Sequence, residues 1–241
     1  MTAQLVDYST AADHRTAMVD LAQRAGERLE GASPFEILQW AADTFSEGLV
    51  VATSLQDSVT VDLASRVRPG IDVVFLDTGY HFAETMGMRD AVSSAYPVTF
   101  FSITPKQTVA EQDATYGKDL WRTNPNRCCA LRKVEPLERA LDGYTAWISG
   151  LRRVEAVTRR DAKAVEWDAK RNMVKINPIV AWDDEELDKY IAHRGILINP
   201  LQYDGYPSIG CAPCTRRVAP GEDPRSGRWA GSGKVECGLH T

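Results

Sequence analysis

The apolar run Leu49-Val50-Val51-Ala52-Thr53 is followed by a polar turn, Ser54-Leu-Gln-Asp-Ser58, and by a helical pattern that reaches about Arg68. Short continuous apolar runs of this kind are typical of strands buried on both faces of a sheet. The same succession occurs twice more, with strands predicted at Ile71–Leu76 and Pro97–Ser102 and helices predicted over 81–94 and from Thr104. Three rounds of strand and helix with short connections predict an α/β fold with a doubly wound, mainly parallel sheet.

The flanking segments extend this plan. Residues 11–48 have a helical pattern, and Ser33-Pro34-Phe35-Glu36 within it has the sequence of a capping box. The later elements are predicted as a helix over 127–142, a fourth strand over Tyr144–Ser149, a hairpin over Ala164–Ile176 and a helix from Asp183 to about Arg194. We therefore divide the chain into an N-terminal helical segment (1–48), an α/β domain (49–218) and a mobile C-terminal tail (219–241).

Composition places the chain among ordinary globular proteins. It has 241 residues, of which 44% are hydrophobic and 25% are charged. The N-terminus lacks the pattern of a signal peptide, and no apolar run reaches membrane-spanning length. We therefore expect a cytoplasmic protein with no membrane partner. In a reducing compartment, its five cysteines point to metal ligands or reactive thiols rather than to disulfides.

Charge is unevenly distributed along the chain. The net charge is −5, but residues 1–121 carry 17 acidic and 8 basic side chains, whereas residues 122–241 carry 16 and 20. The basic residues of the second half gather around 127–133, 152–160 and 216–228. Scattered arginines are often only solvated surface, but three clusters favour a small anion, because the guanidinium group suits phosphate and sulfate. The acidic overall balance argues against a nucleic-acid partner.

Polar residues follow three of the predicted strands, at the edge where doubly wound sheets bind ligands. They are Ser54 and Ser58 after the first strand, Asp77, Thr78 and Gly79 after the second, and Arg152 and Arg153 after the fourth. The first group lies at a predicted helix N-terminus, which favours an anion, although a simple helix cap explains it equally. This loop is similar to the Ser-Gly-Gly-x-Asp-Ser loop of ATP-pyrophosphatases, with Leu55 and Gln56 in place of the glycines. We expect these side chains to crowd a pyrophosphate, so that an adenylate suits the loop better than ATP.

Four of the five cysteines form a candidate metal set, the adjacent Cys128 and Cys129 together with Cys211 and Cys214 of a C-x-x-C motif. Adjacent Cα atoms are only ~3.8 Å apart, and on a helix the two side chains diverge by about 100°. A bulky iron–sulfur cluster accommodates this arrangement more readily than one zinc ion. Zinc, or a pair of cysteines that is merely buried, remains the alternative.

The fifth cysteine, Cys237, lies in a polar tail that we expect to be exposed, with Lys234 before it and His240 after it. Positive neighbours lower the pKa of a thiol and increase its thiolate fraction. Cys237 is therefore a candidate nucleophile, and an incidental tail cysteine is the alternative.

Taken together, these motifs resemble one family, the iron–sulfur-containing adenylyl-sulfate (APS) reductases of the assimilatory sulfonucleotide reductases. The resemblance runs from about Leu49 to the C-terminus, and residues 1–48 carry little of it. The segments that carry it are the loop Ser54–Ser58, Leu76-Asp-Thr-Gly-Tyr-His-Phe-Ala-Glu-Thr85, Cys128-Cys-Ala-Leu-Arg-Lys133-Val-Glu-Pro136, Gly150-Leu-Arg-Arg153, Cys211-Ala-Pro-Cys214-Thr-Arg216, Gly221-Glu-x-x-Arg225-x-Gly-Arg228-Trp229 and Glu236-Cys-Gly-Leu-His240.

The resemblance implies a fold of the adenine-nucleotide (ATP-pyrophosphatase/PAPS reductase-like) type and a [4Fe-4S] cluster on the four cysteines of the metal set. It also implies that Cys237, with Lys133 and His240 beside it in the site, attacks the sulfur of APS, expels AMP and becomes an S-sulfocysteine. Thioredoxin then releases sulfite, as in sulfate assimilation and cysteine biosynthesis. Arg225 and Arg228 join Arg152 and Arg153 as candidate substrate ligands, and residues 219–233 become the hinge of a lid.

Three alternatives remain open. Use of the 3′-phosphorylated substrate PAPS is one, although reductases of that compound typically lack the CC and C-x-x-C cysteines. A cluster-bearing tRNA thiolase should carry the two loop glycines and a more basic surface. A non-catalytic zinc-binding interaction module should contain zinc and no iron.

Overall fold

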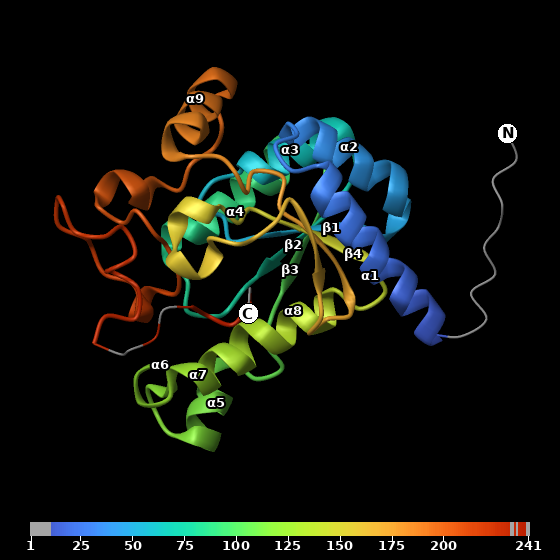
Figure 1. The fold of residues 1–241 in the computed structure, drawn as a ribbon. Coiled ribbons are helices and arrows are strands. Elements are labelled where there is room, and N and C mark those ends of the chain that lie inside the picture. The colour runs from blue at the N-terminus through green and yellow to red at the C-terminus, as the bar shows by residue number, and fades with distance from the viewer. Residues whose placement is uncertain (1–10, 232–233, 235, 240–241) are drawn as a thin grey trace, which may run out of the picture.

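The computed structural model describes residues 11–231, 234 and 236–239, and within them a six-stranded sheet forms the centre of the molecule (Figure 1). The strands are β1 (Leu49–Thr53), β2 (Asp72–Leu76), β3 (Thr99–Ile103), β4 (Ala146–Ser149), β5 (Val165–Asp168) and β6 (Met173–Ile176). Their order is β3-β2-β1-β4-β6-β5, and all pairs are parallel except the β5–β6 hairpin. The predicted doubly wound, mainly parallel sheet is thereby confirmed.

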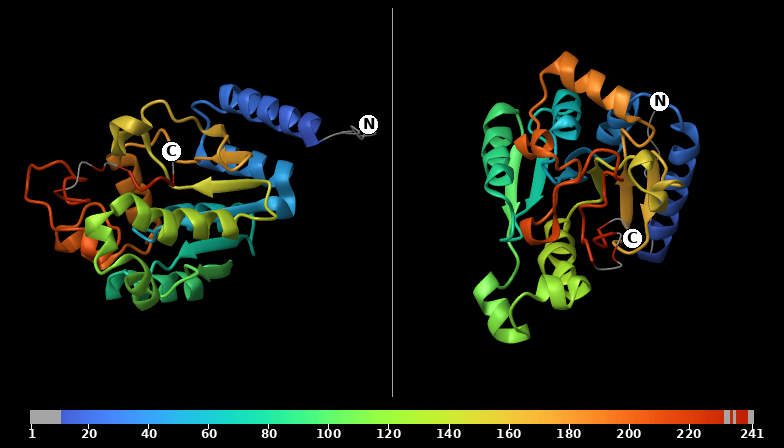
Figure 2. Two further views of the ribbon diagram at one scale, coloured as in Figure 1. Left: turned by 90° about the horizontal axis from the view of Figure 1, so that it is seen from below. Right: turned by 90° about the vertical axis from the view of Figure 1, so that its left-hand side faces the viewer.

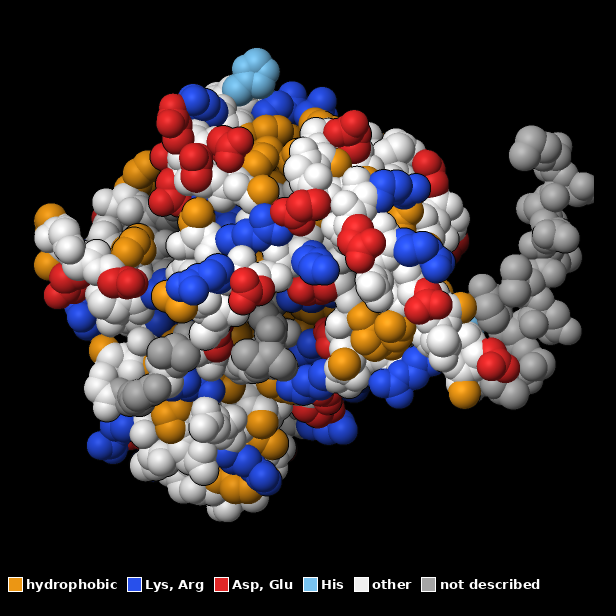
Figure 3. All heavy atoms as spheres, in the orientation of Figure 1, with side chains coloured by type: hydrophobic (Ala, Val, Ile, Leu, Met, Phe, Trp, Pro, Cys, Tyr) orange, Lys and Arg blue, Asp and Glu red, His pale blue; other side chains and the backbone are white. Residues whose placement is uncertain are grey.

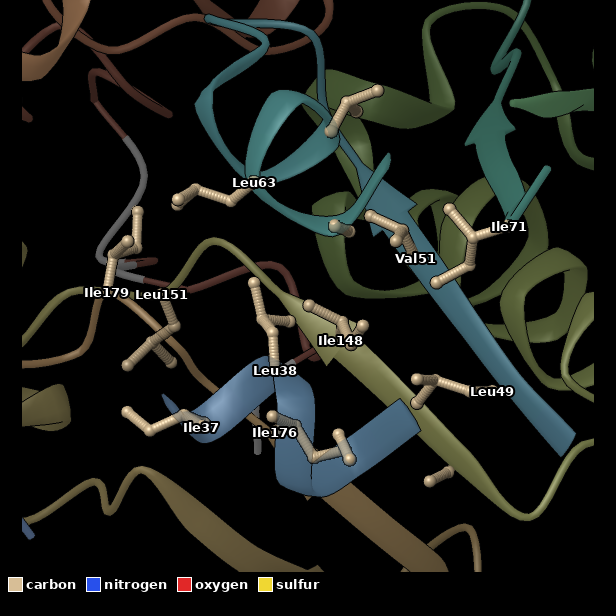
Figure 4. Packing of buried hydrophobic residues seen from close by; sticks show 14 of the residues in the cluster. Ile37, Leu38, Leu49, Val51, Leu63, Ile71, Ile148, Leu151, Ile176 and Ile179 are labelled. Atoms are coloured by element: carbon tan, nitrogen blue, oxygen red, sulfur yellow. The ribbon is translucent and has the colours of Figure 1, made fainter. Parts of the chain in front are cut away.

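Helices cover both faces of this sheet (Figure 1). They are α1 (Ala11–Arg28), α2 (Pro34–Phe45), α3 (Val59–Val67), α4 (Ala83–Ala95), α5 (Val109–Tyr116), α6 (Leu120–Thr123), α7 (Pro125–Cys129), α8 (Glu135–Ala140) and α9 (Asp184–Arg194). Leu49 and Val51 of β1 pack with side chains of α2 and α3 on one face (Figure 4). Val50, between them, points to the opposite face and packs with Leu137 of α8. The two-residue period of a strand therefore supplies two separate cores.

Two predicted helices begin or continue differently from expectation. The helix predicted from Thr104 begins only at Val109, because Thr108 and Glu111 form a capping box there. The helix predicted over 127–142 contains a π-helical turn at Ala130–Val134, in which the Glu135 N–H donates to the Ala130 carbonyl. Pro136 has no N–H to continue the α-helical pattern, and a widened turn just before it accommodates this loss.

The C-terminal half of the chain returns to the carboxyl ends of the strands. Residues 200–231 lie at that end of the sheet in both views of Figure 2. The Gln56 side chain after β1 accepts from the Ile209 N–H and donates to the Pro207 carbonyl, which anchors this segment. None of the helices in the described residues is long and apolar enough to span a membrane.

Candidate active site

The loop after β1 keeps a conformation that usually requires glycine. Leu55 has φ +59°, in the left-handed region that costs most residues about 1–2 kcal/mol. Its side chain is fully buried in the core, and the Gln56 side chain is held by the 207–209 segment. Leu55 is therefore directed into the core and Gln56 toward the 207–209 segment, and the crowding of a pyrophosphate that we expected from these side chains stays a prediction.

The two serines of this loop have different surroundings. Ser54 is exposed. Ser58 is completely buried, and its hydroxyl lies 2.7 Å from the Tyr96 hydroxyl and donates to the Leu197 carbonyl at 3.1 Å. Ser58 thus supports the loop in this structure, and a direct contact with substrate stays a prediction for both serines.

The loop after β2 joins the strand end to the C-x-x-C motif. Asp77 accepts from the Gly79 N–H, and Gly79 takes φ +72°. The Thr78 hydroxyl lies 3.3 Å from Cys211 Sγ, and the Ala212 N–H donates to the Tyr80 carbonyl at 2.7 Å. This turn therefore fixes where the C-x-x-C begins.

All four cysteines of the predicted metal set line one pocket, together with Tyr80, Trp121, Pro125, Arg132, Lys133 and Trp229. Burial, followed by the charges of the neighbouring Cys129, Cys211 and Cys214, raises the pKa of Cys128 to about 12. Burial, followed by Cys211, raises the pKa of Cys214 to about 11. Four thiols whose negative charges oppose one another are stabilised as thiolates only by a cationic group among them.

The thiols line the walls of the pocket and do not converge on one point. Among the described residues, no three Cys, His, Asp or Glu side chains are arranged to hold a single metal ion. A zinc ion needs four ligands at about 2.0–2.3 Å. The donor set therefore matches a soft, thiolate-bound group in number and kind.

Arg132 forms a wall of this pocket that the sequence analysis did not single out. Its guanidinium group donates to the Thr78 carbonyl at 2.6 Å, to the Gln107 carbonyl at 3.2 Å and to Gln112 Oε1 at 3.1 Å. It also lies 5.1 Å from the centre of the Tyr80 ring. Arg132 lies in the π-helical turn directly after Cys129. No local pattern in the sequence predicts this turn, so Arg132 could not be singled out in advance.

The predicted substrate cations divide into two groups by their partners. Three of them are ion-paired within the fold: Arg152 with Asp184 and Glu155, Arg153 with Glu30, and Arg225 with Glu236. Within the part of the chain that the structure describes, no carboxylate lies at ion-pair distance from the other two, Lys133 and Arg228. Arg228 donates to the Ser208 hydroxyl and the Ile209 carbonyl, and its buried Nε has no partner.

Lys133 and Arg228 each interact electrostatically with Cys237 and with cysteines of the four-thiol pocket. Burial lowers the pKa of Lys133, but the charges of Cys211 and Cys237 outweigh it, and the pKa is raised. Burial likewise lowers the pKa of Arg228, and here it prevails over the opposing influence of Cys237. Two positive charges with no described carboxylate at ion-pair distance favour the binding of an anion.

The segment predicted as a mobile connection is folded against the C-x-x-C motif in its described part. The Trp229 N–H donates to the Cys214 carbonyl at 2.9 Å, and the Trp229 side chain is buried beneath the Arg228 guanidinium. Cys237 is half-buried, so the chain is not enclosed in the core at this position. His240 lies outside the described residues, and the mobility of the tail stays a prediction. Lysine and arginine side chains gather over the middle of the face shown in Figure 3.

Comparison with protein families finds a match over residues 48–217 to the phosphoadenosine phosphosulfate reductase domain. The chain belongs to this family. Among its relatives, the adenosine 5′-phosphosulfate reductase of Mycolicibacterium smegmatis is 54% identical over 98% of this chain and 99% of the relative. The enzyme of the same name from Streptomyces coelicolor is 58% identical over 91% of this chain and 93% of its own length. The chain is therefore an enzyme of the phosphoadenosine phosphosulfate reductase family.

Solved structures agree on the fold. The phosphoadenylyl-sulfate reductase of Candida auris superimposes with a TM-score of 0.68 and 30% identity, over 79% of this chain and 94% of that chain. The FMN adenylyltransferase of Candida glabrata gives a TM-score of 0.55 at 14% identity, over 87% of this chain and 66% of that chain, and this likeness concerns the fold alone. The adenine-nucleotide type of sheet expected from the sequence is confirmed.

Proposed function

We propose that this enzyme reduces adenosine 5′-phosphosulfate to sulfite and AMP in assimilatory sulfate reduction, on the route to cysteine. The observation that carries the proposal is the pair of cations, Lys133 and Arg228, which have no carboxylate at ion-pair distance among the described residues and interact electrostatically with both Cys237 and the four-thiol pocket. The names of the relatives that are more than half identical support the same substrate. A cytoplasmic location and a small dithiol protein of the thioredoxin kind as reductant complete the proposal.

We further propose that Cys128, Cys129, Cys211 and Cys214 hold a [4Fe-4S] cluster. Its support is the set of four thiols that line one pocket, where burial and neighbouring thiols raise the pKa values of Cys128 and Cys214. When bound, the cluster would hold the four cysteines together and tune the site rather than supply electrons for turnover. The residues around it, Thr78 and Arg132 in particular, hold the two halves of the donor set in register.

In this proposal, Cys237 is the residue that reacts covalently with the substrate. Its thiolate attacks the sulfur of the sulfate group, the bond from that sulfur to the bridging oxygen breaks, and AMP leaves with the electron pair. The enzyme then carries an S-sulfocysteine. A thiolate of the reductant attacks Cys237 Sγ and sulfite departs with the electron pair of the sulfur–sulfur bond. The second thiol of the reductant resolves the mixed disulfide, regenerates the Cys237 thiol and leaves the reductant oxidised.

The two cations offset the main electrostatic repulsion in this reaction. A thiolate that approaches an anionic sulfur meets negative charge, and positive groups already in place offset that repulsion without reorganisation. Lys133 and Arg228 are proposed for this role. Ser54, Asp77, Thr78 and Gly79, at the carboxyl ends of β1 and β2, remain the candidates for binding the nucleotide, where sheets of this kind bind their ligands.

The test is sulfite release with thioredoxin, with APS compared against PAPS as substrate. We expect APS to support turnover and PAPS to support little or none. Incubation with APS in the absence of reductant should add the mass of one SO₃ group to the peptide that contains Cys237, and Cys237→Ser should abolish it. An adduct that persists in Cys237→Ser refutes the assignment of the nucleophile. Preference for PAPS refutes the proposed substrate.

A further inference from the structure

The residue before Cys237 is held more firmly than the rest of the described tail. The Glu236 side chain is only 8% exposed, and both of its carboxylate oxygens accept from Arg159, at 2.9 Å from Nε and 3.2 Å from Nη2. Arg225 approaches the second oxygen at 3.3 Å. A bidentate, charge-assisted contact of this kind is among the strongest that two side chains form.

Arg159 is itself fixed by the main body of the protein. It belongs to the 3₁₀ turn Val157–Arg159, which follows the Arg152–Arg153 segment after β4. Its side chain is 10% exposed and also contacts the Glu155 carboxylate. The Arg159 guanidinium group is therefore positioned by contacts outside the tail. Its partner Glu236 belongs to the tail itself.

The chain after Cys237 is docked as well, but by weaker contacts. The Lys170 ammonium group donates to the Gly238 carbonyl at 3.3 Å, and this bond is exposed. Leu239 packs against the smaller of the two cores, beside Val50 and Trp147. Cys237 thus lies between an ionic contact on one side and an apolar contact on the other.

We propose that Arg159 is a positioning residue for the reaction. Its pair with Glu236, which we call the tail latch, holds Cys237 toward Lys133 and Arg228 during sulfur transfer. Opening of the tail latch then presents the modified cysteine to the reductant. The proposal rests on the proposed function, because it takes Cys237 to be the nucleophile.

The electrostatics explain why this pair can act as a latch. A buried carboxylate is stable only while it is paired, and loss of Arg159 leaves Glu236 with one oxygen held by Arg225 and with the more distant charge of Arg228. Exposure of Glu236 to water then becomes the lower-energy state, and the tail leaves with it. Arg225 is the weaker anchor, because it reaches one oxygen at 3.3 Å and lies on the same C-terminal segment.

The test compares Arg159→Ala with Arg160→Ala in the full-length, iron-loaded protein. Arg160 is the adjacent residue and is exposed, so its loss controls for the removal of one positive charge from this turn. Two measurements report on the tail without turnover: hydrogen exchange of the C-terminal peptide, and the rate of Cys237 alkylation, located by mass spectrometry and followed against pH. The pH series separates the exposure of the thiol from a change in its pKa. A third measurement is single-turnover formation of the S-sulfocysteine.

We expect Arg159→Ala to speed exchange of the tail peptide and the pH-independent alkylation of Cys237 by about tenfold or more, as loss of a buried charged contact implies. S-sulfocysteine formation should slow by a similar factor at saturating APS, with KM changed far less, because substrate still binds. Arg159→Lys, which keeps the charge but loses the two-pronged contact, should fall between. Arg160→Ala should behave as wild type. If Arg159→Ala does not fold, Glu236→Gln weakens the same contact from the tail side.

Two results overturn the proposal. One is a tail in Arg159→Ala that exchanges and alkylates as slowly as in wild type, which removes the tail latch whatever the substrate. The other is a released tail with an unchanged rate of S-sulfocysteine formation, which removes the positioning role. Failure of the proposed function appears separately, as absence of any APS-derived adduct in the wild-type protein.

Discussion

Replacement of Arg132 by Met is the change whose effect can be worked most directly from the geometry. Methionine has a side chain of similar reach but donates no hydrogen bond. Three acceptors lose their donor, namely the Thr78 and Gln107 carbonyls and the amide oxygen of the fully buried Gln112. A buried acceptor left unpaired costs about 1–3 kcal/mol, and the whole change should cost about 3–5 kcal/mol, since the better apolar packing of Met offsets part of it.

In a chain of this length, 1 kcal/mol corresponds to about 2–4 °C in the melting temperature, so Arg132→Met should melt roughly 6–20 °C lower than wild type. The assays are thermal unfolding and urea unfolding of the purified protein. Arg139→Met is the matched control, because Arg139 lies on α8 and its contacts with Glu135 and the Thr104 carbonyl are exposed. Its loss should cost below about 1 kcal/mol.

A local effect should accompany the loss of stability. Arg132 ties the helix that carries Cys128 to the Thr78 turn that contacts Cys211, so the two halves of the donor set should separate more easily. Iron should therefore be lost faster to a chelator in Arg132→Met than in Arg139→Met. The reasoning is refuted if Arg132→Met unfolds within 1 kcal/mol of wild type, because the three bonds would then contribute nothing in sum.

Three further predictions concern the site and the sheet. Lys133→Met should slow single-turnover S-sulfocysteine formation about 100-fold, as expected for loss of one preorganised charge, and should leave the iron content unchanged. Replacement of the exposed Lys106 by Met is the control and should have no effect. Equal rates in the two variants would dismiss the role of Lys133. Burial, together with the hydrogen bond that it donates to Asp72, raises the pKa of Tyr144 to about 12. The protonated phenol is thus favoured in the folded state, so its stabilisation is complete below pH 10 and is lost as pH rises toward 12; Tyr144→Phe should flatten stability over that window, and an unchanged slope would contradict the assignment. Leu55→Gly relieves a left-handed conformation worth about 1–2 kcal/mol but removes a fully buried side chain worth about 2–5 kcal/mol, so chemical unfolding should show a net loss, and a gain in stability would show that strain dominates.

Sequence-based prediction and structure agree most closely where the local sequence alone determines the conformation. The capping boxes at Ser33 and Asp183 begin α2 and α9 where their patterns predicted. The continuous apolar run of β1, buried on both faces, and the short hairpin between β5 and β6 were also predicted, because both depend on neighbours along the chain. The motif residues after β1 and β2 could be named in advance for the same reason.

The partners of the charged residues could not be predicted in this way. Seven positions were expected to contact substrate or catalyse as cations or serines, yet Ser58 is bonded inside the core and Arg152, Arg153 and Arg225 are each paired with a carboxylate. Glu30, which pairs with Arg153, is 123 residues away in the sequence. No local pattern carries that information, since an ion pair depends on which loops the sheet brings together.

By itself, the sequence determined the order of strands and helices, the four cysteines of the donor set and the separate fifth thiol, because periodicity and motif spacing are properties of the chain. Tertiary structure alone decided which positive charges near those thiols lack an ion-pair partner among the described residues and which arginine pairs with Glu236. The physical reason is that charge compensation and burial are set by contacts between segments far apart in sequence, such as Arg159 with Glu236. The same residue type, arginine, therefore supports the fold at one position and faces the site at another.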